Sequence, residues 1–236
     1  MRTNLLQSLD GTLVVSCQAD AGTPLDAPQH IAALAASVVE GGASAVRIEG
    51  VNNITTVSSR VTVPVIGLIK TQRADTEVYI TATVEDAHAV AGAGAHIIAF
   101  DATCRPRPVE VPVLIEAIKG HGCLAMADIS TAEEAELAMA AGADVVSTTM
   151  AGYTDYTGGQ AGPDFALMGT LGQAGIPFVA EGRIWTPKDA LRCLKLGARF
   201  IVAGSAITRP TLITRHFIEQ MASSSAAENV DKRASS

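Results

Sequence analysis

The sequence predicts a single-domain (β/α)8 barrel, and three observations support this fold. Eight short apolar runs of strand length recur along the 236 residues. Helical patterns separate most of these runs, and such alternation favours parallel strands joined by crossover helices. A glycine-containing phrase repeats where helix gives way to strand, as GGASAV, GAGAHII, AGADVV and LGARFIV. Eight evenly spaced units are what a closed barrel needs, and an open doubly wound sheet is the structural alternative.

The predicted elements follow one another along the whole chain. Each strand is rich in Val, Ile or Ala and bounded by Gly, Pro or polar residues. We expect strands at Thr12–Cys17, Ala43–Ile48, Val63–Ile69, Ala95–Phe100, Cys123–Ala127, Asp144–Thr148, Pro177–Ala180 and Arg199–Ala203. We expect helices at Ala27–Glu40, Thr83–Gly92, Val109–Lys119, Thr131–Ala141, Asp164–Gln173 and Pro187–Leu196. Gly42, Gly94, Gly142 and Gly197 stand where a left-handed glycine would end a helix.

Composition excludes several classes of protein. Hydrophobic residues make up 48% of the chain and aromatic residues only 4%, so the core must consist of small and branched aliphatic side chains. The formal net charge of −7 argues against a nucleic-acid-binding surface, although one local anion site remains compatible with it. No apolar run approaches the roughly 20 residues that span a bilayer, and the N-terminus lacks a signal-peptide pattern. Four cysteines without CxxC spacing indicate reduced thiols in a cytoplasmic protein.

The chain is expected to form one catalytic domain over residues 1–222. From 223 to 236 the sequence SSSAAENVDKRASS is polar and of low complexity, which predicts a disordered tail. Two connections are unusually long, at 71–82 and 149–162. Long loops that follow strands belong to the catalytic face of a barrel.

Polar residues occur where the predicted strands end, and Lys70 and Glu181 are the two most suited to proton transfer. Lys70 ends the run VPVIGLIK. It is either a surface lysine whose stem covers apolar residues, a base with a lowered pKa, or an amine that forms a Schiff base. Glu181 follows a buried strand, so it is either catalytic or held in an ion pair with Arg183 or Arg47.

Other strand ends suggest a substrate site with a phosphate subsite. Asp128 either contacts a sugar or caps the following helix, a role that Ser130 could also take. The segment VAGSAITRP enters the last helical unit, where barrels often hold phosphate. We expect phosphate to be bound by Gly182, Gly204, Ser205 and Arg209, the alternative being ordinary helix capping by Ser205 or Thr208.

Metal and cofactor chemistry is not expected. None of the five histidines falls at a predicted strand end, and HxH and CxxC patterns are absent from the sequence. Cys17, in VSCQA, lacks a nearby histidine or cation in the sequence and is interpreted as a buried, unreactive thiol, as are the other three cysteines.

Several long peptides of this chain resemble those of bacterial N-acetylmannosamine-6-phosphate 2-epimerases. They are VSCQA, AVRIEG, PVIGLIK, IIAFDAT, MADIST, the GYT of TTMAGYT, VAEGRI and GSAITRP, in register from about Ser16 to Pro210. The resemblance implies a TIM barrel of sialic-acid breakdown that interconverts N-acetylmannosamine 6-phosphate and N-acetylglucosamine 6-phosphate without a cofactor. Two positions depart from the pattern: the loop TQRADTE at 71–77 and Phe100.

The resemblance also implies roles for individual residues. Lys70 and Glu181 fall on the catalytic positions, and the phosphate subsite falls on the four residues predicted above. The substrate-binding residues are expected to be Gln18, Arg47, Asp128 and Arg183. Opening of the sugar ring makes the C2 proton acidic. We assign Lys70 to proton transfer at C2 and Glu181 to the sugar oxygens, in ring opening or at O1 of the enolate; the sequence leaves the exchanged assignment open.

Two rival functions remain open at this stage. One is a Schiff-base aldolase or another phosphate-binding barrel in which Lys70 becomes covalently attached. The other is a sugar-phosphate sensor without catalytic activity. As partners we expect a phosphorylated amino sugar and neither nucleic acid nor membrane. The sequence leaves open whether a second copy of the chain forms a homodimer with the first.

Overall fold

Eight parallel strands form a closed barrel in chain order, as the sequence predicts. The structure is a computed structural model that describes residues 2–159 and 161–234. The strands are β1 (Leu13–Cys17), β2 (Ala45–Glu49), β3 (Val65–Leu68), β4 (Ile97–Asp101), β5 (Leu124–Asp128), β6 (Val145–Ser147), β7 (Phe178–Glu181) and β8 (Ile201–Ala203). Pairing of β1 with β8 closes the barrel and excludes the open doubly wound sheet.

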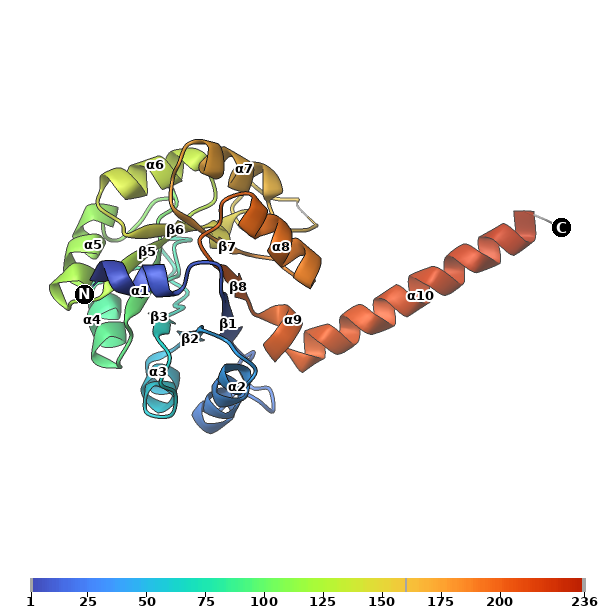
Figure 1. Cartoon of the computed structure of the whole chain (residues 1–236), viewed down its shortest axis with the longest axis horizontal. Coiled ribbons are helices and arrows are strands. Elements are labelled where there is room, and N and C mark those ends of the chain that lie inside the picture. Colours follow the sequence, from blue (N-terminus) through green and yellow to red (C-terminus); the bar gives the residue numbers. More distant parts are fainter. Residues whose placement is uncertain (1, 160, 235–236) are drawn as a thin grey trace.

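Helices surround the barrel on the outside (Figure 1). They are α1 (Arg2–Ser8), α2 (Pro28–Glu40), α3 (Val51–Ser58), α4 (Val84–Gly92), α5 (Val111–Gly120), α6 (Ala132–Ala140), α7 (Phe165–Gln173), α8 (Pro187–Lys195), α9 (Ser205–Thr208) and α10 (Pro210–Ala234), with a 3-10 turn, η1 (Thr148–Met150). Each predicted strand and helix lies within two residues of the observed one at both ends. The helices α1, α3, α9 and α10 are not among those that the sequence predicts.

Apolar side chains fill two separate layers. One cluster fills the barrel interior and includes Ile66 and Leu68 of β3; α1 and the turn after it add Leu6 and Leu9, which close one end. The other lies between the strands and the helices. Gly67 faces this outer layer, where a Cβ atom would lie 2.7 Å from side-chain atoms of Val90 and Ala95. Glycine at this position therefore lets α4 pack closely against β3.

Helix ends follow the local rules that the sequence indicates. The glycines of the repeated phrase have φ values of 100°, 103°, 98° and 102° at Gly42, Gly94, Gly142 and Gly197, as predicted for the left-handed region. Thr83, Thr131 and Thr186 each begin a helix with a reciprocal capping box. Glycines and threonine caps thus define where these helices end and begin, and with them the loops that connect helices and strands.

The last helix leaves the barrel. α10 begins at Pro210 and projects outward into solvent (Figure 1). Its distal part runs through the segment from 223, for which the sequence predicts disorder; the domain boundary at 222 stays a prediction. Among the helices of the described residues, none is both long and apolar enough to cross a membrane.

Candidate functional site

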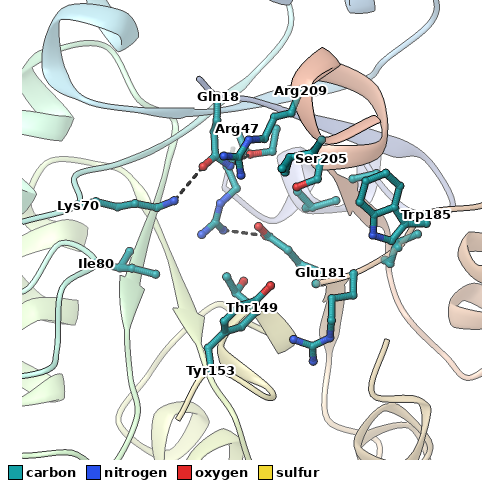
Figure 2. Close-up of a pocket in the computed structure, with 18 of the residues that line it drawn as sticks. Gln18, Arg47, Lys70, Ile80, Thr149, Tyr153, Glu181, Trp185, Ser205 and Arg209 are labelled. Carbon is teal, nitrogen blue, oxygen red and sulfur yellow. Dashed lines mark hydrogen bonds and ion pairs between the residues drawn. The ribbon is translucent and has the colours of Figure 1, made fainter. Parts of the chain in front are cut away.

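A cavity of about 420 Å³ opens at the ends of the strands from which the long loops leave. Nearly all the residues predicted for the site line it: Gln18, Arg47, Lys70, Glu181, Gly182, Arg183, Gly204, Ser205 and Arg209. Asp128 lies behind this wall, fully buried, and contacts Arg47. The barrel therefore brings together side chains from β1, β2, β5, β7 and the loops after β3, β7 and β8 (Figure 2).

Lys70 reaches the cavity from the start of the loop that follows β3. Its backbone pairs with Ile80 in an antiparallel bridge, so the loop folds back on itself at this point. Nζ of Lys70 donates a hydrogen bond to Oε1 of Gln18 at 2.8 Å (Figure 2). The protein atoms around the amine, and next the positive charge of Arg47, lower the pKa of Lys70 below its ordinary value. A larger fraction of neutral amine is thereby available as a base.

Arg47 joins two carboxylates at the floor of the cavity. Its Nη2 and Nη1 donate to Asp128 at 2.7 and 3.3 Å, and Nη1 lies 3.0 Å from Oε2 of Glu181. The arginine side chain is 2% exposed and that of Glu181 12% exposed. A guanidinium buried to this degree is stabilised by carboxylates that accept its N–H groups. Arg47 thus fixes the positions of both carboxylates.

Glu181 is held at its backbone as well as at its carboxylate. The hydroxyl of Thr148 donates to the carbonyl oxygen of Glu181 at 2.8 Å and accepts from its N–H at 3.1 Å. Burial raises the pKa of Glu181 to about 7, against the opposing effect of the Arg47 charge, and the nearby Asp128 charge raises it further. Glu181 can therefore both give and take a proton near neutral pH.

Two glycine-containing loops and Arg209 also line the cavity. A Cβ atom on Gly204 would lie 3.0 Å from Cβ of Ser16, so the backbone runs close to β1 at this point. Gly182 has φ +107°, a conformation that favours glycine. The Arg209 guanidinium forms an ion pair with the exposed Asp20. Backbone amides beside an arginine form a surface suited to an oxyanion.

Arg183, predicted to bind substrate, has a structural role at the cavity wall. Its guanidinium donates to the carbonyl oxygens of Ala151 at 2.6 Å and Gly162 at 2.9 Å, and it lies over the Tyr153 ring at 4.9 Å. A Cβ atom on Gly152 would lie 2.5 Å from this guanidinium. Arg183 therefore ties down the β6–α7 loop; its contact with substrate stays a prediction.

The structure decides between the alternatives for three other residues. Thr131 rather than Asp128 or Ser130 caps α6, so Asp128 is left to bind Arg47. No side chain caps α9, which follows Gly204 directly. Thr208 instead donates to the carbonyl oxygen of Ser16 at 2.7 Å. Helix capping therefore does not account for Asp128 or Ser130 at α6, nor for Ser205 or Thr208 at α9.

Sequence reasoning missed the apolar and aromatic part of the wall. Tyr79 and Ile80 come from the β3–α4 loop, Ile184 and Trp185 follow β7, and Leu212 comes from α10. The Trp185 ring stacks on His216 of α10 at 4.8 Å between centroids. The unusual length of the β3–α4 loop pointed to this region, but no periodicity marks which of its residues face inward.

Metal-binding geometry is absent from the residues that the structure describes, where no three His, Cys, Asp or Glu side chains group together. Cys17 is buried beneath the site, and burial raises the pKa of its thiol to about 12. A thiol in this state is a poor nucleophile. The chemistry available to the cavity is therefore acid–base transfer between an amine and a carboxyl group, beside an anion-binding surface.

Comparisons with known proteins find similar chains that cover most of the sequence. The family model described as "Putative N-acetylmannosamine-6-phosphate epimerase" matches residues 31–223. Two proteins with the corresponding 2-epimerase name are each 45% identical to the chain. The one from Escherichia coli O9:H4 (strain HS) matches over 87% of this chain and 92% of its own length, and the one from Yersinia pseudotuberculosis serotype O:3 (strain YPIII) over 87% and 88%. The solved N-acetylmannosamine-6-phosphate 2-epimerase from Clostridium perfringens is 41% identical, with a TM-score of 0.88 over 91% of this chain and 95% of its own.

Proposed function

Because the chain belongs to the N-acetylmannosamine-6-phosphate epimerase family, we propose that it interconverts N-acetylmannosamine 6-phosphate and N-acetylglucosamine 6-phosphate. Such an activity would serve the breakdown of sialic acid. The observation that carries the proposal is the convergence of Lys70 and Glu181 on one cavity, an amine with a lowered pKa and a carboxyl with a raised one. Pairs of groups whose pKa values are pushed toward neutrality suit proton transfer at a carbon next to a carbonyl.

The reaction requires an open sugar. Ring opening converts the C1 hemiacetal into an aldehyde, and the proton on C2 then lies next to a carbonyl. In the proposed scheme the neutral Lys70 amine removes the C2 proton, the electron pair moves toward C1, and protonated Glu181 gives its proton to O1. The enol chain rotates about its C2–C3 bond. Lys70 then returns a proton to the other face of C2 while Glu181 takes back the O1 proton, so the two groups finish as they began.

Substrate placement follows from the two sides of the cavity. Amides near Gly182, Gly204 and Ser205, with Arg209, would hold the phosphate, which lies far from C2 along the sugar chain. Gln18 and the Arg47–Asp128 pair lie at the Lys70 side, where sugar hydroxyls or the amide of the substrate would bind. Binding energy from the phosphate then helps to hold the reactive carbon in place.

A Schiff-base aldolase is the rival that the same lysine permits. In this alternative Lys70 forms an imine with the substrate, and borohydride would reduce the imine to a stable secondary amine. We expect no mass increase on Lys70 when borohydride is added to enzyme and N-acetylmannosamine 6-phosphate. A mass increase equal to the reduced adduct at Lys70 would favour the covalent mechanism.

The experiment that tests the proposed function is a direct assay with the phosphorylated sugar. Proton NMR of N-acetylmannosamine 6-phosphate with the parent protein should show the anomeric signals of N-acetylglucosamine 6-phosphate growing to equilibrium. Unphosphorylated N-acetylmannosamine is the matched control and should react far more slowly. Binding of the phosphorylated sugar without any conversion would instead indicate a sensor.

We also propose that the chain forms a homodimer through α10. Three large apolar side chains lie at one face of this helix and are mostly exposed: Phe217 at 64%, Ile218 at 62% and Met221 at 71%. A cluster of this kind on a projecting helix is typical of an interface. Sedimentation analysis of the parent and of Phe217→Glu should give a dimer and a monomer, respectively; a monomeric parent would contradict this proposal.

The cellular setting belongs to the same proposal. The four cysteines show no CxxC spacing, and three of them are buried, which supports a protein of the reducing cytoplasm. The net charge of −7 supports a protein that does not bind nucleic acid.

A further inference from the structure

The hydroxyl of Thr149 lies between the two carboxylates of the site. Its Oγ1 donates to Oδ1 of Asp128 at 2.9 Å, and it lies 2.8 Å from Oγ of Ser147 on β6. Thr149 also lines the cavity that Glu181 faces (Figure 2). Figure 2 shows Thr149 beside Glu181 at the cavity. Burial raises the pKa of both carboxyl groups, and hydrogen bonding from Thr149 opposes that rise.

The number of protons decides what this hydroxyl can do. A threonine hydroxyl has one proton to donate and can accept from a second donor. When it donates to Asp128, it cannot donate to Glu181 at the same time. Ser147 can donate to Thr149 in either case, which leaves the Thr149 proton free to turn toward either carboxylate.

The two carboxylates differ in how much they need this proton. Asp128 keeps two N–H groups of Arg47 when Thr149 turns away. Oε2 of Glu181 is buried and accepts no hydrogen bond from the described residues, although Arg47 lies 3.0 Å away. An ionised Glu181 has a single contact with Arg47, whereas Asp128 has two. Glu181 therefore gains more from the hydroxyl than Asp128 loses, because a buried charge with few partners is costly.

Thr148, the neighbouring residue in η1, keeps this arrangement in place. Its hydroxyl makes both backbone hydrogen bonds of Glu181. The backbone of β6 is joined to β5, since the Ile129 N–H donates to the carbonyl oxygen of Ser147 at 2.8 Å. The Thr148–Thr149 turn thus links the strand that carries Asp128 to the strand that carries Glu181.

We propose that Thr149 is a positioning residue whose hydroxyl turns from Asp128 to Glu181 when Glu181 gives up its proton. This inference rests on the proposed function, because the proton in question is the one that Glu181 transfers to the sugar oxygen. Thr149 then sets the pH range in which Glu181 can act, and Ser147 serves as the donor that orients Thr149.

The pH dependence of kcat/KM tests the proposal. In the parent, kcat/KM should fall as the pH rises through the Glu181 pKa of about 7. Thr149→Val removes the donor to ionised Glu181 while keeping the shape of the side chain. The falling limb should then move to higher pH by about one to two units, the equivalent of one hydrogen bond to a charged group.

Matched variants separate the hydroxyl from packing. Thr149→Ser keeps the hydroxyl and should restore the parent limb, and Ser147→Ala should give a smaller shift in the same direction. Thr170→Val removes an exposed threonine hydroxyl on α7 and should leave the limb unchanged. An unshifted limb in Thr149→Val, or an equal shift in Thr149→Ser, would overturn the proposal. If Thr149→Val does not fold, Thr149→Ala is read in the same way.

Infrared titration gives a readout that does not depend on turnover. The carboxylic C=O band that disappears in Glu181→Gln belongs to Glu181. The pH at which this band loses half of its intensity is the midpoint, and it can be measured in each variant. The midpoint should rise in Thr149→Val and return in Thr149→Ser; an unchanged midpoint contradicts the role of Thr149. A parent protein that shows the Thr149-dependent midpoint but no epimerisation would instead disprove the proposed function.

Discussion

Nη1 of Arg47 lies 3.0 Å from Oε2 of Glu181, while Nη2 of the same guanidinium lies 2.7 Å from Oδ2 of Asp128. One buried cation thus serves two buried carboxylates. Asp128 accepts two hydrogen bonds from Arg47, one of them the shortest of the three contacts. Glu181, with a single contact and a pKa of about 7, is the group that exchanges its proton near neutral pH. This division assigns the acid role to Glu181 and the role of a fixed partner of Arg47 to Asp128, whose pKa is also raised by burial.

The raised pKa of Glu181 has a consequence for stability. The folded protein holds this proton up to about pH 7, whereas the unfolded chain loses it near the ordinary glutamate pKa of 4.5. The contribution of Glu181 to folding stability is therefore most favourable below pH 4.5 and is lost as the pH rises toward 7, by about 1.4 kcal/mol for each pKa unit.

Glu181→Gln, which cannot titrate, should escape this loss. The difference in melting temperature, variant minus parent, should be larger at pH 8 than at pH 5. It should grow by about 2–4 °C for each kcal/mol of stability that the parent loses between the two pH values. Thermal denaturation at both pH values measures it. A constant difference in melting temperature would show that Glu181 has an ordinary pKa.

Lys70→Ala should abolish turnover while leaving the fold intact. Lys70 is the amine that faces Glu181 across the cavity, so its removal should lower kcat by at least 10²–10⁴-fold, as is usual for general acid–base catalysis. Lys188→Ala, on the exposed first turn of α8, is the matched control and should keep parent activity. Near-parent kcat in Lys70→Ala, measured by the NMR assay, would place the base elsewhere.

Arg209→Ala should weaken substrate binding more than it slows turnover. Loss of a charge-assisted bond to phosphate costs roughly 1.5–3 kcal/mol, which corresponds to a rise in KM of about 10- to 150-fold. The advantage of the phosphorylated sugar over the unphosphorylated one should shrink in this variant. An unchanged KM would mean that backbone amides alone hold the phosphate, or that the phosphate binds at another site.

Arg183→Ala should loosen the β6–α7 loop. The guanidinium holds this loop through Ala151 and Gly162 and lies against Tyr153, so its removal should speed amide hydrogen exchange over residues 151–159. Exchange in α3, which follows β2 on the opposite side of the barrel from β6, provides the internal reference. Equal exchange in parent and variant would show that the loop is held by its other contacts.

Most of the fold and of the site composition could be predicted from the sequence, for identifiable reasons. Short aliphatic runs predict the strands, and glycines such as Gly42 and Gly94 predict the helix ends, because both signals are local in the sequence. Lys70 and Glu181 were found because the carboxyl ends of all strands in a barrel meet on one face.

Residues whose function depends on pairing across the barrel could not be found in this way. The sequence predicts that Arg183 binds substrate, and it gives no sign that the guanidinium donates to backbone carbonyls of a loop 21 to 32 residues earlier in the chain. The sequence names Arg47 as an ion-pair partner of Glu181, and the structure confirms that pair. Nothing in the spacing of these residues predicts that Asp128 shares the same guanidinium. The sequence predicts a strand that ends at Thr148 and a loop from residue 149, whereas the structure has a 3-10 turn, η1, at this place.

Proton NMR in heavy water tests the central claim most directly. The parent protein is incubated in D2O with N-acetylmannosamine 6-phosphate, and the C2–H signals of both epimers are followed with time. The account predicts that N-acetylglucosamine 6-phosphate forms with deuterium at C2, because the proton removed by Lys70 exchanges with solvent before its return. Product that forms with full protium at C2, or substrate that binds without forming product, would contradict it.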